Sequence, residues 1–272
     1  MAKTDTTTRK LSPEGRNWWL LMVGILLVAW LLSTPEGLLG KADALGYAVC
    51  HRIDARSFHI DGRQTPLCAR CTGMYLGAVL GLFIQMSAAP RRAGMPAIRF
   101  WIVLGSLIAA FGIDGLNSYL QFFPNAPRLY ETINIVRLLT GSGMGLVVAL
   151  LIYPAFNQSA WKTVDMKPAL SGLKMLVFLV LSVLIVDWLV YLQIPYLLFI
   201  FSLISAAGIL VLLTMIYTVF WLFLLKTENQ YESFTQLSFP LTLGFGTSLL
   251  QVALFNWARF ALTGTWDGFI IG

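Results

Sequence analysis

All three cysteines and both histidines of this chain lie in one segment, between positions 50 and 71. Cys68 and Cys71 form a Cys-x-x-Cys pair, and Cys50 is followed directly by His51. Such a pair supplies two thiolates for one tetrahedral ion, and a third thiolate with one imidazole completes a ligand set that zinc prefers. The sequence therefore predicts a zinc site formed by Cys50, His51, Cys68 and Cys71. His59 is the alternative nitrogen ligand, because adjacent residues reach one ion only through a sharply bent backbone.

The same cysteines support two interpretations without a metal. In the first, Cys68 and Cys71 form a redox disulfide, Arg70 lowers the pKa of a thiol, and Cys50 exchanges with the pair. An odd number of cysteines leaves one thiol free, as such a relay requires. The protein would then be a membrane thiol-disulfide oxidoreductase coupled to a quinone. In the second, the thiols form a static disulfide or stay buried and inert.

A second group of polar residues follows later in the chain. Its members are Asp114, Asn117, Arg128, Glu131, Asn134 and Arg137. Charges at membrane depth are costly enough to indicate function, and arginine binds carboxylates and phosphates through paired hydrogen bonds. We therefore expect a charged pocket for an anionic, lipid-like or small-molecule ligand. The expected ligand-binding residues are Arg63, Gln64, Arg128 and Arg137. If the protein is an enzyme, the expected catalytic base is Asp114 or Glu131.

Ion pairing between helices is the structural alternative for these charges. Arg137 is expected to pair with Asp114 or Glu131. By the same reasoning Asp187 is expected to pair with Arg259, because both lie near the outer ends of their predicted helices.

The elements that position these residues are apolar helices. The 272 residues are 57% hydrophobic and only 12% charged, a composition too apolar for a soluble domain. Seven runs approach or exceed the roughly 20 residues that cross a bilayer. They cover residues 18–34, 71–88, 100–120, 133–153, 170–192, 196–225 and 239–262. The sequence therefore predicts an all-α, polytopic transmembrane bundle of about seven helices in the cell membrane.

The basic residues predict the orientation of this bundle. With the N-terminus inside, the inner segments hold eleven of the 19 lysines and arginines and the outer segments six. Because positive loops stay inside, we expect the N-terminus inside and the C-terminus outside. The net charge of +6 is scattered over short loops, so we expect membrane lipid as a partner and no nucleic acid.

The chain divides into three parts by composition. Residues 1–16 form a polar tail, 17–156 a four-helix membrane domain with the cysteine-rich loop, and 157–272 a three-helix C-terminal extension. The first apolar run follows basic residues without a cleavage pattern, which is typical of an uncleaved signal anchor.

A pattern of residues in the first half of the chain resembles a known family. The pattern comprises Cys50-His51, Arg56-Ser57-Phe58, Gly62-Arg63-Gln64, Pro66, Cys68-Ala69-Arg70-Cys71-Thr72-Gly73, Asp114-Gly115, Arg128, Glu131, Asn134, Arg137-Leu138 and Thr140-Gly141. It resembles the domain-of-unknown-function 2085 family of prokaryotic membrane proteins over roughly residues 48–150. The resemblance implies that the four expected metal ligands form one pattern with Arg63, Gln64, Asp114, Arg128, Glu131 and Arg137. His59 looks less like part of it, and residues 161–272 lie beyond it.

The leading functional hypothesis is a zinc-supported polar pocket near the outer leaflet. A zinc ion with four protein ligands is closed and structural, whereas an open position permits binding or catalysis. A noncatalytic carrier or membrane-complex subunit is a further expectation, because a charged pocket can equally hold a ligand or a partner protein.

Overall fold

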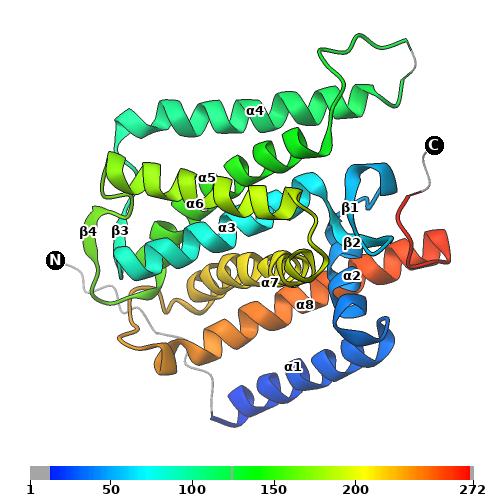
Figure 1. Cartoon of the computed structure of the whole chain (residues 1–272). Coiled ribbons are helices and arrows are strands. Elements are labelled where there is room, and N and C mark those ends of the chain that lie inside the picture. The colour runs from blue at the N-terminus through cyan, green and yellow to red at the C-terminus, as the bar shows by residue number, and fades with distance from the viewer. Residues whose placement is uncertain (1–12, 124, 270–272) are drawn as a thin grey trace.

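Seven long helices and one short helix dominate the computed structural model, which describes residues 13–123 and 125–269. Consecutive long helices run in opposite directions (Figure 1), and each is long and apolar enough to cross a membrane. The long helices are α1 (Pro13–Ser33), α3 (Ala69–Ala88), α4 (Trp101–Leu120), α5 (Asn134–Ala160), α6 (Leu173–Tyr191), α7 (Pro195–Leu225) and α8 (Phe234–Thr263). The predicted all-α, polytopic fold is confirmed. Most of the expected polar tail lies outside the described residues, and α1 begins at Pro13.

Several helix ends follow signals in the sequence. Proline has no N–H to lose at a helix start, and α7 begins at Pro195. The Ser233 hydroxyl caps α8 by accepting from the Gln236 N–H, and Gly264 ends that helix with a positive φ of 69°. Helix α5 continues to Ala160, past the expected end at residue 153, because its last turns are fixed by hydrogen bonds to the loop before α4.

The connection between α1 and α3 is more ordered than the sequence suggested. It contains helix α2 (Gly37–Val49), a short 3-10 turn η1 (Asp54–Arg56) and the antiparallel strands β1 (Ser57–Ile60) and β2 (Arg63–Cys68). Helix α2 was not predicted, because it is too short to cross a membrane and contains three glycines. The strands are joined by Asp61 and Gly62, both with positive φ, which is the two-residue turn that favours a hairpin.

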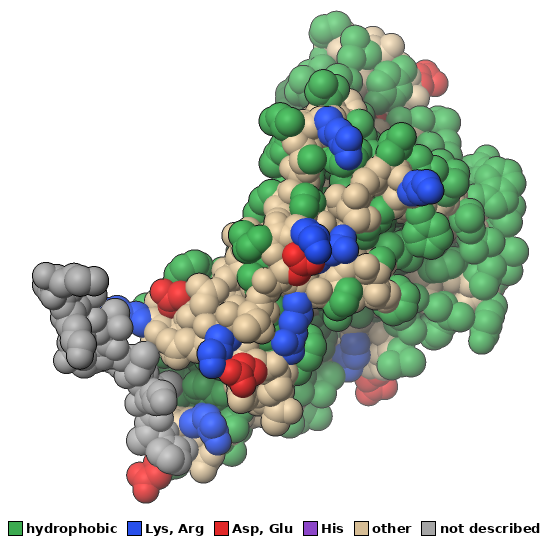
Figure 2. All heavy atoms as spheres, turned by 90° about the vertical axis from the view of Figure 1, so that its left-hand side faces the viewer, with side chains coloured by type: hydrophobic (Ala, Val, Ile, Leu, Met, Phe, Trp, Pro, Cys, Tyr) green, Lys and Arg blue, Asp and Glu red, His purple; other side chains and the backbone are tan. Residues whose placement is uncertain are grey.

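The two ends of the bundle carry different connecting segments (Figure 1). The cysteine end carries α2, β1, β2 and the segment after α8. The basic end carries β3 (Arg92–Gly94) and β4 (Asp165–Pro168), which pair in parallel. Figure 2 looks onto the basic end, where Lys and Arg side chains gather with fewer acidic ones. The positive-inside rule predicts that the cysteine end is the outer end, and this orientation stays a prediction.

Helices α3 and α5 cross in the closest contact of the bundle. A Cβ atom added to Gly73 or Gly77 on α3 would collide with the backbone of α5, and one added to Gly141 or Gly145 would collide with α3. Small residues at such spacing let membrane helices approach closely. The crossing therefore fixes the first turn of α3, which carries Cys71, against the start of α5.

The parts on either side of residue 157 pack against each other. Helix α7 lies along α3, and α1 contacts α8. Trp30 of α1, Cys50, and Leu249 of α8 belong to one buried apolar cluster. The cysteine loop is therefore held by both halves of the chain.

Candidate functional site

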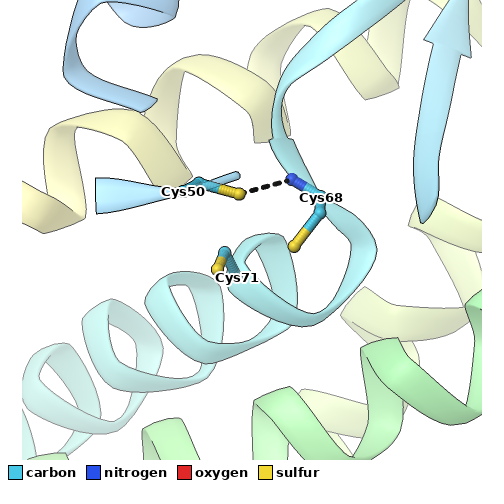
Figure 3. Close-up of side chains that lie close together, drawn as sticks. All are labelled: Cys50, Cys68 and Cys71. Carbon is cyan, nitrogen blue, oxygen red and sulfur yellow. Dashed lines mark hydrogen bonds between the residues drawn. The ribbon is translucent and has the colours of Figure 1, made fainter. Parts of the chain in front are cut away.

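The three cysteines meet where α2 ends and α3 begins. Cys50 is the C-cap of α2, Cys68 is the N-cap of α3, and Cys71 lies in the first turn of that helix. Figure 3 shows the three side chains gathered beside the start of α3, and all three sulfurs lie within 4.8 Å of one another. None forms a disulfide. Cys50 and Cys68 are buried, and Cys71 is partly exposed.

The local backbone explains this convergence. The hairpin returns the chain to the end of α2, and Gly46 of α2 lies against the carbonyl group of Pro66, where a side chain would not fit. The Cys68 N–H donates to the Cys50 sulfur at 3.3 Å, and the Arg52 N–H donates to it at 3.5 Å. Cys68 and Cys71 sit at a helix N-terminus, whose dipole favours negative charge. The backbone is therefore arranged to stabilise thiolates.

The thiols of Cys50 and Cys68 differ in how readily they lose a proton. Hydrogen bonds from the Cys68 and Cys71 thiols hold the pKa of Cys50 well below its ordinary value. The hydrogen bond to Cys50 raises the pKa of Cys68 to about 12. Cys50 is therefore the thiol that loses its proton more readily, and Cys68 holds its proton more tightly.

Neither histidine places a ring nitrogen within this sulfur cluster. The His51 Nδ1 accepts a hydrogen bond from the Ile53 N–H at 3.0 Å, and burial lowers the pKa of this imidazole. His59 lies on β1, where its Nε2 is 2.9 Å from a carboxylate oxygen of Asp54. Of the four expected ligands, the structure brings together the three thiols.

Three arginines gather beside the cysteines around one carboxylate. Arg70 donates from Nε to the Asp114 Oδ2 at 3.0 Å, and a second nitrogen also pairs with that oxygen. Arg56 donates to the carbonyl oxygen of Ser118 on the same helix as Asp114. Arg137 is near enough for its charge to interact with both arginines and with Asp114. Burial, followed by the charge of Arg70, lowers the pKa of Arg56. We call Arg56, Arg70 and Arg137 the arginine cluster.

The ion pair of Asp114 differs from the expected one. Arg70 takes the place predicted for Arg137, whose side chain instead donates to three neutral oxygens. Arg70 lies at the start of α3 and Asp114 toward the end of α4, so both are at the cysteine end and the predicted topology allowed them to pair. The sequence argument missed it because it treated Arg70 only as a neighbour of the thiols.

The two candidate bases have very different surroundings. Asp114 is 1% exposed and also accepts hydrogen bonds from the Tyr130 and Thr140 hydroxyls. Burial and the bond to Asp114 raise the pKa of Tyr130 to about 12. Glu131 is exposed and makes no hydrogen bond or ion pair with the described residues, and neither does Arg128. The structure therefore leaves Arg128 and Glu131 outside the arginine cluster, and their predicted roles stay predictions.

Arg63 and Gln64 hold the cysteine loop in shape. Asp43 of α2 accepts from Arg52 at 2.9 Å through one oxygen and from Arg63 at 2.7 Å through the other. The Gln64 amide donates to the carbonyl oxygen of Arg52 and to the Ser57 hydroxyl. These contacts tie α2 to the hairpin, and their expected role in ligand binding stays a prediction.

The expected ion pair between Asp187 and Arg259 is wrong. Arg259 donates to the carbonyl oxygens of Tyr47 and Cys50, at 2.8 and 2.6 Å, where the end of α2 presents its negative dipole. Asp187 instead contacts the Ser142 hydroxyl. Sequence alone could not show that unpaired carbonyl groups at a helix end would bind this arginine.

The chain after α8 folds back over the cysteine loop. The Phe269 N–H donates to the carbonyl oxygen of His51, and Arg52 donates to that of Trp266. A groove of about 400 Å³ remains between the ends of α2 and α8, and Cys50, His51 and Arg259 line it. No pattern in the sequence predicted that this segment folds back over the cysteine loop.

The part of the chain that holds both clusters is similar to known proteins. The family model described as Predicted membrane protein (DUF2085) matches residues 50–151. An uncharacterized protein of Methanothermobacter thermautotrophicus is 31% identical over 103 residues, which are 38% of this chain and 83% of that protein. An uncharacterized protein of Methanocaldococcus jannaschii is 29% identical over 114 residues, which are 42% of this chain and 67% of that protein. No solved structure matches the chain. With its seven apolar helices, the chain belongs to this family of multi-pass membrane proteins.

Proposed function

We propose that this protein binds a zinc ion through Cys50, Cys68 and Cys71, and that the fourth coordination position takes an anionic ligand. The observation that carries the proposal is the spacing of the three sulfurs, all within 4.8 Å of one another. Zinc–sulfur bonds of about 2.3 Å in tetrahedral geometry place sulfurs about 3.8 Å apart. A small adjustment of side chains is therefore enough to close the cluster on an ion.

The surroundings of the sulfurs favour the charge that a metal requires. Zinc binds thiolates, and two backbone N–H groups already donate to Cys50. Arg56 and Arg137 are near enough for their charges to interact with Cys68. Such cations lower the cost of removing thiol protons.

The fourth position is open because of the bonds that the histidines make. With Nδ1 accepting from the Ile53 N–H, a neutral His51 carries its proton on Nε2 and has no free lone pair for a metal. The Nε2 of His59 is bound to Asp54. A site with three protein ligands and one open position binds an exchangeable ligand.

The charge balance indicates the sign of that ligand. Three thiolates around Zn²⁺ carry one net negative charge, whereas the arginine cluster with Asp114 carries two positive charges. One positive charge remains, and a carboxylate or a lipid phosphodiester neutralises it.

Metal analysis of protein purified without chelator tests the zinc site. We expect about one zinc per chain, and its loss in Cys50→Ser, Cys68→Ser and Cys71→Ser. His59→Ala is the matched control and keeps the metal, as does His51→Ala. Protein that neither copurifies with zinc nor binds added zinc would refute the proposal, and zinc loss in His51→Ala would refute the open position.

Lipid binding tests the anionic ligand separately. Zinc-loaded protein is placed in nanodiscs of phosphatidylcholine with or without phosphatidylglycerol, and retention of the anionic lipid is measured after detergent extraction. We expect Arg137→Gln to lose this retention and Arg128→Gln, at an exposed arginine outside the arginine cluster, to keep it. Equal retention in both variants contradicts the assignment of the ligand to the arginine cluster.

A thiol oxidoreductase is the second candidate, favoured by the three free cysteines and by the position of Cys68 and Cys71 at the start of α3. Their two thiols would form a disulfide and pass two electrons and two protons to a quinone, which becomes a quinol. Metal-free protein that reduces a soluble quinone, with the Cys68–Cys71 disulfide as product, would favour this function over zinc binding.

A further inference from the structure

Asp187 is a buried carboxyl group that the proposed function does not use. It lies on α6, one turn before the outer end of that helix, and is 1% exposed. Its Oδ1 is 2.6 Å from the Ser142 Oγ on α5. Its Oδ2 is buried and has no hydrogen-bond partner among the described residues.

The hydrogen bonds of Ser142 determine where the proton lies. The Ser142 Oγ is 2.9 Å from the carbonyl oxygen of Leu138, one turn earlier on α5, and 2.6 Å from Asp187. A hydroxyl group has one proton to donate, and a carbonyl oxygen can only accept. Both bonds therefore form only if Ser142 donates to Leu138 and the Asp187 carboxyl, being protonated, donates to Ser142.

The charged groups around Asp187 do not oppose this assignment. An ionised carboxylate in an apolar interior needs an ion partner, and helix α6 packs against α3, α5 and α7. On these four helices and on β1, the titratable side chains are Arg70, Cys71, Tyr75, Arg137, Tyr153, Lys174, Tyr191, Tyr196, Tyr217 and His59. Within the described residues, none of them forms a hydrogen bond or ion pair with Asp187, since Arg70 binds Asp114 and Arg137 binds neutral oxygens. Lys174 lies at the opposite end of α6.

A groove at the outer end offers a route for the proton. It has a volume of about 480 Å³ and lies between β1, the start of α5 and the end of α6, with the His59–Asp54 pair on its wall. Phe58 and Ile135 also line it. These two side chains belong to an apolar cluster that also contains Leu138 of α5. Two residues of α6 close to Asp187, Val186 and Val190, belong to the same cluster. This apolar layer therefore extends from the groove to the residues of α6 that flank Asp187.

We propose that Asp187 is a proton-binding site inside the bundle. Its carboxyl group is a neutral acid whose proton forms the hydrogen bond to Ser142. This proton exchanges with water in the outer groove when the apolar layer that contains Phe58 opens. The ligand of this site is the proton itself, and the proposal is independent of the zinc site.

Infrared difference spectroscopy of the full-length protein in nanodiscs tests the protonation state. The C=O stretch of a protonated carboxyl is separate from the carboxylate stretches, so subtraction of Asp187→Asn from wild type at neutral pH isolates this group. We expect one protonated carboxyl band to be lost in Asp187→Asn. The matched control is Asp114→Asn, which removes a carboxylate paired with Arg70 and leaves that band in place. Loss of a carboxylate band in Asp187→Asn overturns the proposal. If Asp187→Asn does not fold, Ser142→Ala tests the same point, because removing the acceptor shifts the carboxyl band, and an unshifted spectrum overturns the proposal.

Transfer into D₂O tests the route. The band shifts as the carboxyl proton exchanges, and its rate of shift is compared in Phe58→Ala and Leu176→Ala. Both remove a buried apolar side chain, but Leu176 lies in a different cluster nearer the basic end of α6. We expect about tenfold faster exchange in Phe58→Ala, because local opening controls access, and no comparable change in Leu176→Ala. Phe58→Leu is the milder variant if Phe58→Ala does not fold. Equal rates in both positions refute the groove as the route.

Discussion

The ion pair between Arg70 and Asp114 makes the sharpest stability prediction. The Asp114 side chain is 1% exposed and that of Arg70 17% exposed. Removing one partner of such a buried pair leaves a charge without compensation and costs about 3–5 kcal/mol, whereas replacing both with apolar groups is often nearly neutral. We therefore expect Arg70→Met and Asp114→Leu to be strongly destabilising alone and much less so together.

The two single variants are expected to differ from each other. In Arg70→Met, Asp114 keeps its bonds from the Tyr130 and Thr140 hydroxyls and remains near the two other arginines. In Asp114→Leu, three arginines remain with no carboxylate among them. Asp114→Leu should therefore lie toward the upper end of the range of about 3–5 kcal/mol and Arg70→Met toward the lower end.

The assay is the free energy of unfolding of all four proteins in mixed micelles, titrated with a denaturing detergent. A coupling energy of more than about 1 kcal/mol between the two substitutions is expected, with the sign of a rescue. The exposed pair of Lys162 and Glu232 at the basic end is the control, and Lys162→Met should change stability little. Additive losses, or an Asp114→Leu variant more stable than Arg70→Met, would refute the charge argument.

Three further predictions concern packing, metal affinity and topology. Gly141→Ala should destabilise the protein by about 1–3 kcal/mol in the same unfolding assay, because the added Cβ would collide with the Arg70 carbonyl oxygen. The control is Gly105→Ala on α4, where the added Cβ meets nothing within 4 Å, and this variant should be neutral or slightly stabilising. Because the pKa of Cys68 is about 12, zinc must displace its proton at neutral pH, so chelator competition should show affinity rising by about tenfold per pH unit for each proton displaced. A pH-independent affinity contradicts this. A membrane-impermeant thiol reagent should label Asn125→Cys in intact cells and Gln230→Cys only after lysis, and the reverse pattern would invert the orientation.

The helices were predictable from the sequence because the bilayer constrains them strongly. A spanning segment needs about 20 apolar residues, and the seven runs marked by that rule are the seven long helices of the structure. The rule makes no prediction about α2, because a helix of 13 residues does not cross the bilayer and has no required length or hydropathy. The hairpin carried a usable signal in Asp61 and Gly62, which favour a tight turn.

The gathering of the cysteines was also predictable, but the partners of the charges were not. The spacing of Cys68 and Cys71 requires them to face one another across one helical turn, whatever the rest of the fold does. Arg259 and Asp187, by contrast, had several partners within reach in the predicted topology. The choice was made by local geometry, because backbone carbonyls at the end of α2 were available to Arg259 and the Ser142 hydroxyl faced Asp187.

The relatives help to separate the two proposed sites. The Methanothermobacter thermautotrophicus protein matches this chain over 103 residues that make up 83% of it, so the remainder has room for about one more span. The cysteine and arginine clusters lie within the matched region of the family, residues 50–151. Asp187 and Arg259 lie outside it, on helices that a protein of that length has no room to reproduce in full. The zinc site is therefore a proposal that extends to the shared region of the family, whereas the proton site depends on α6 and concerns chains that carry the C-terminal helices.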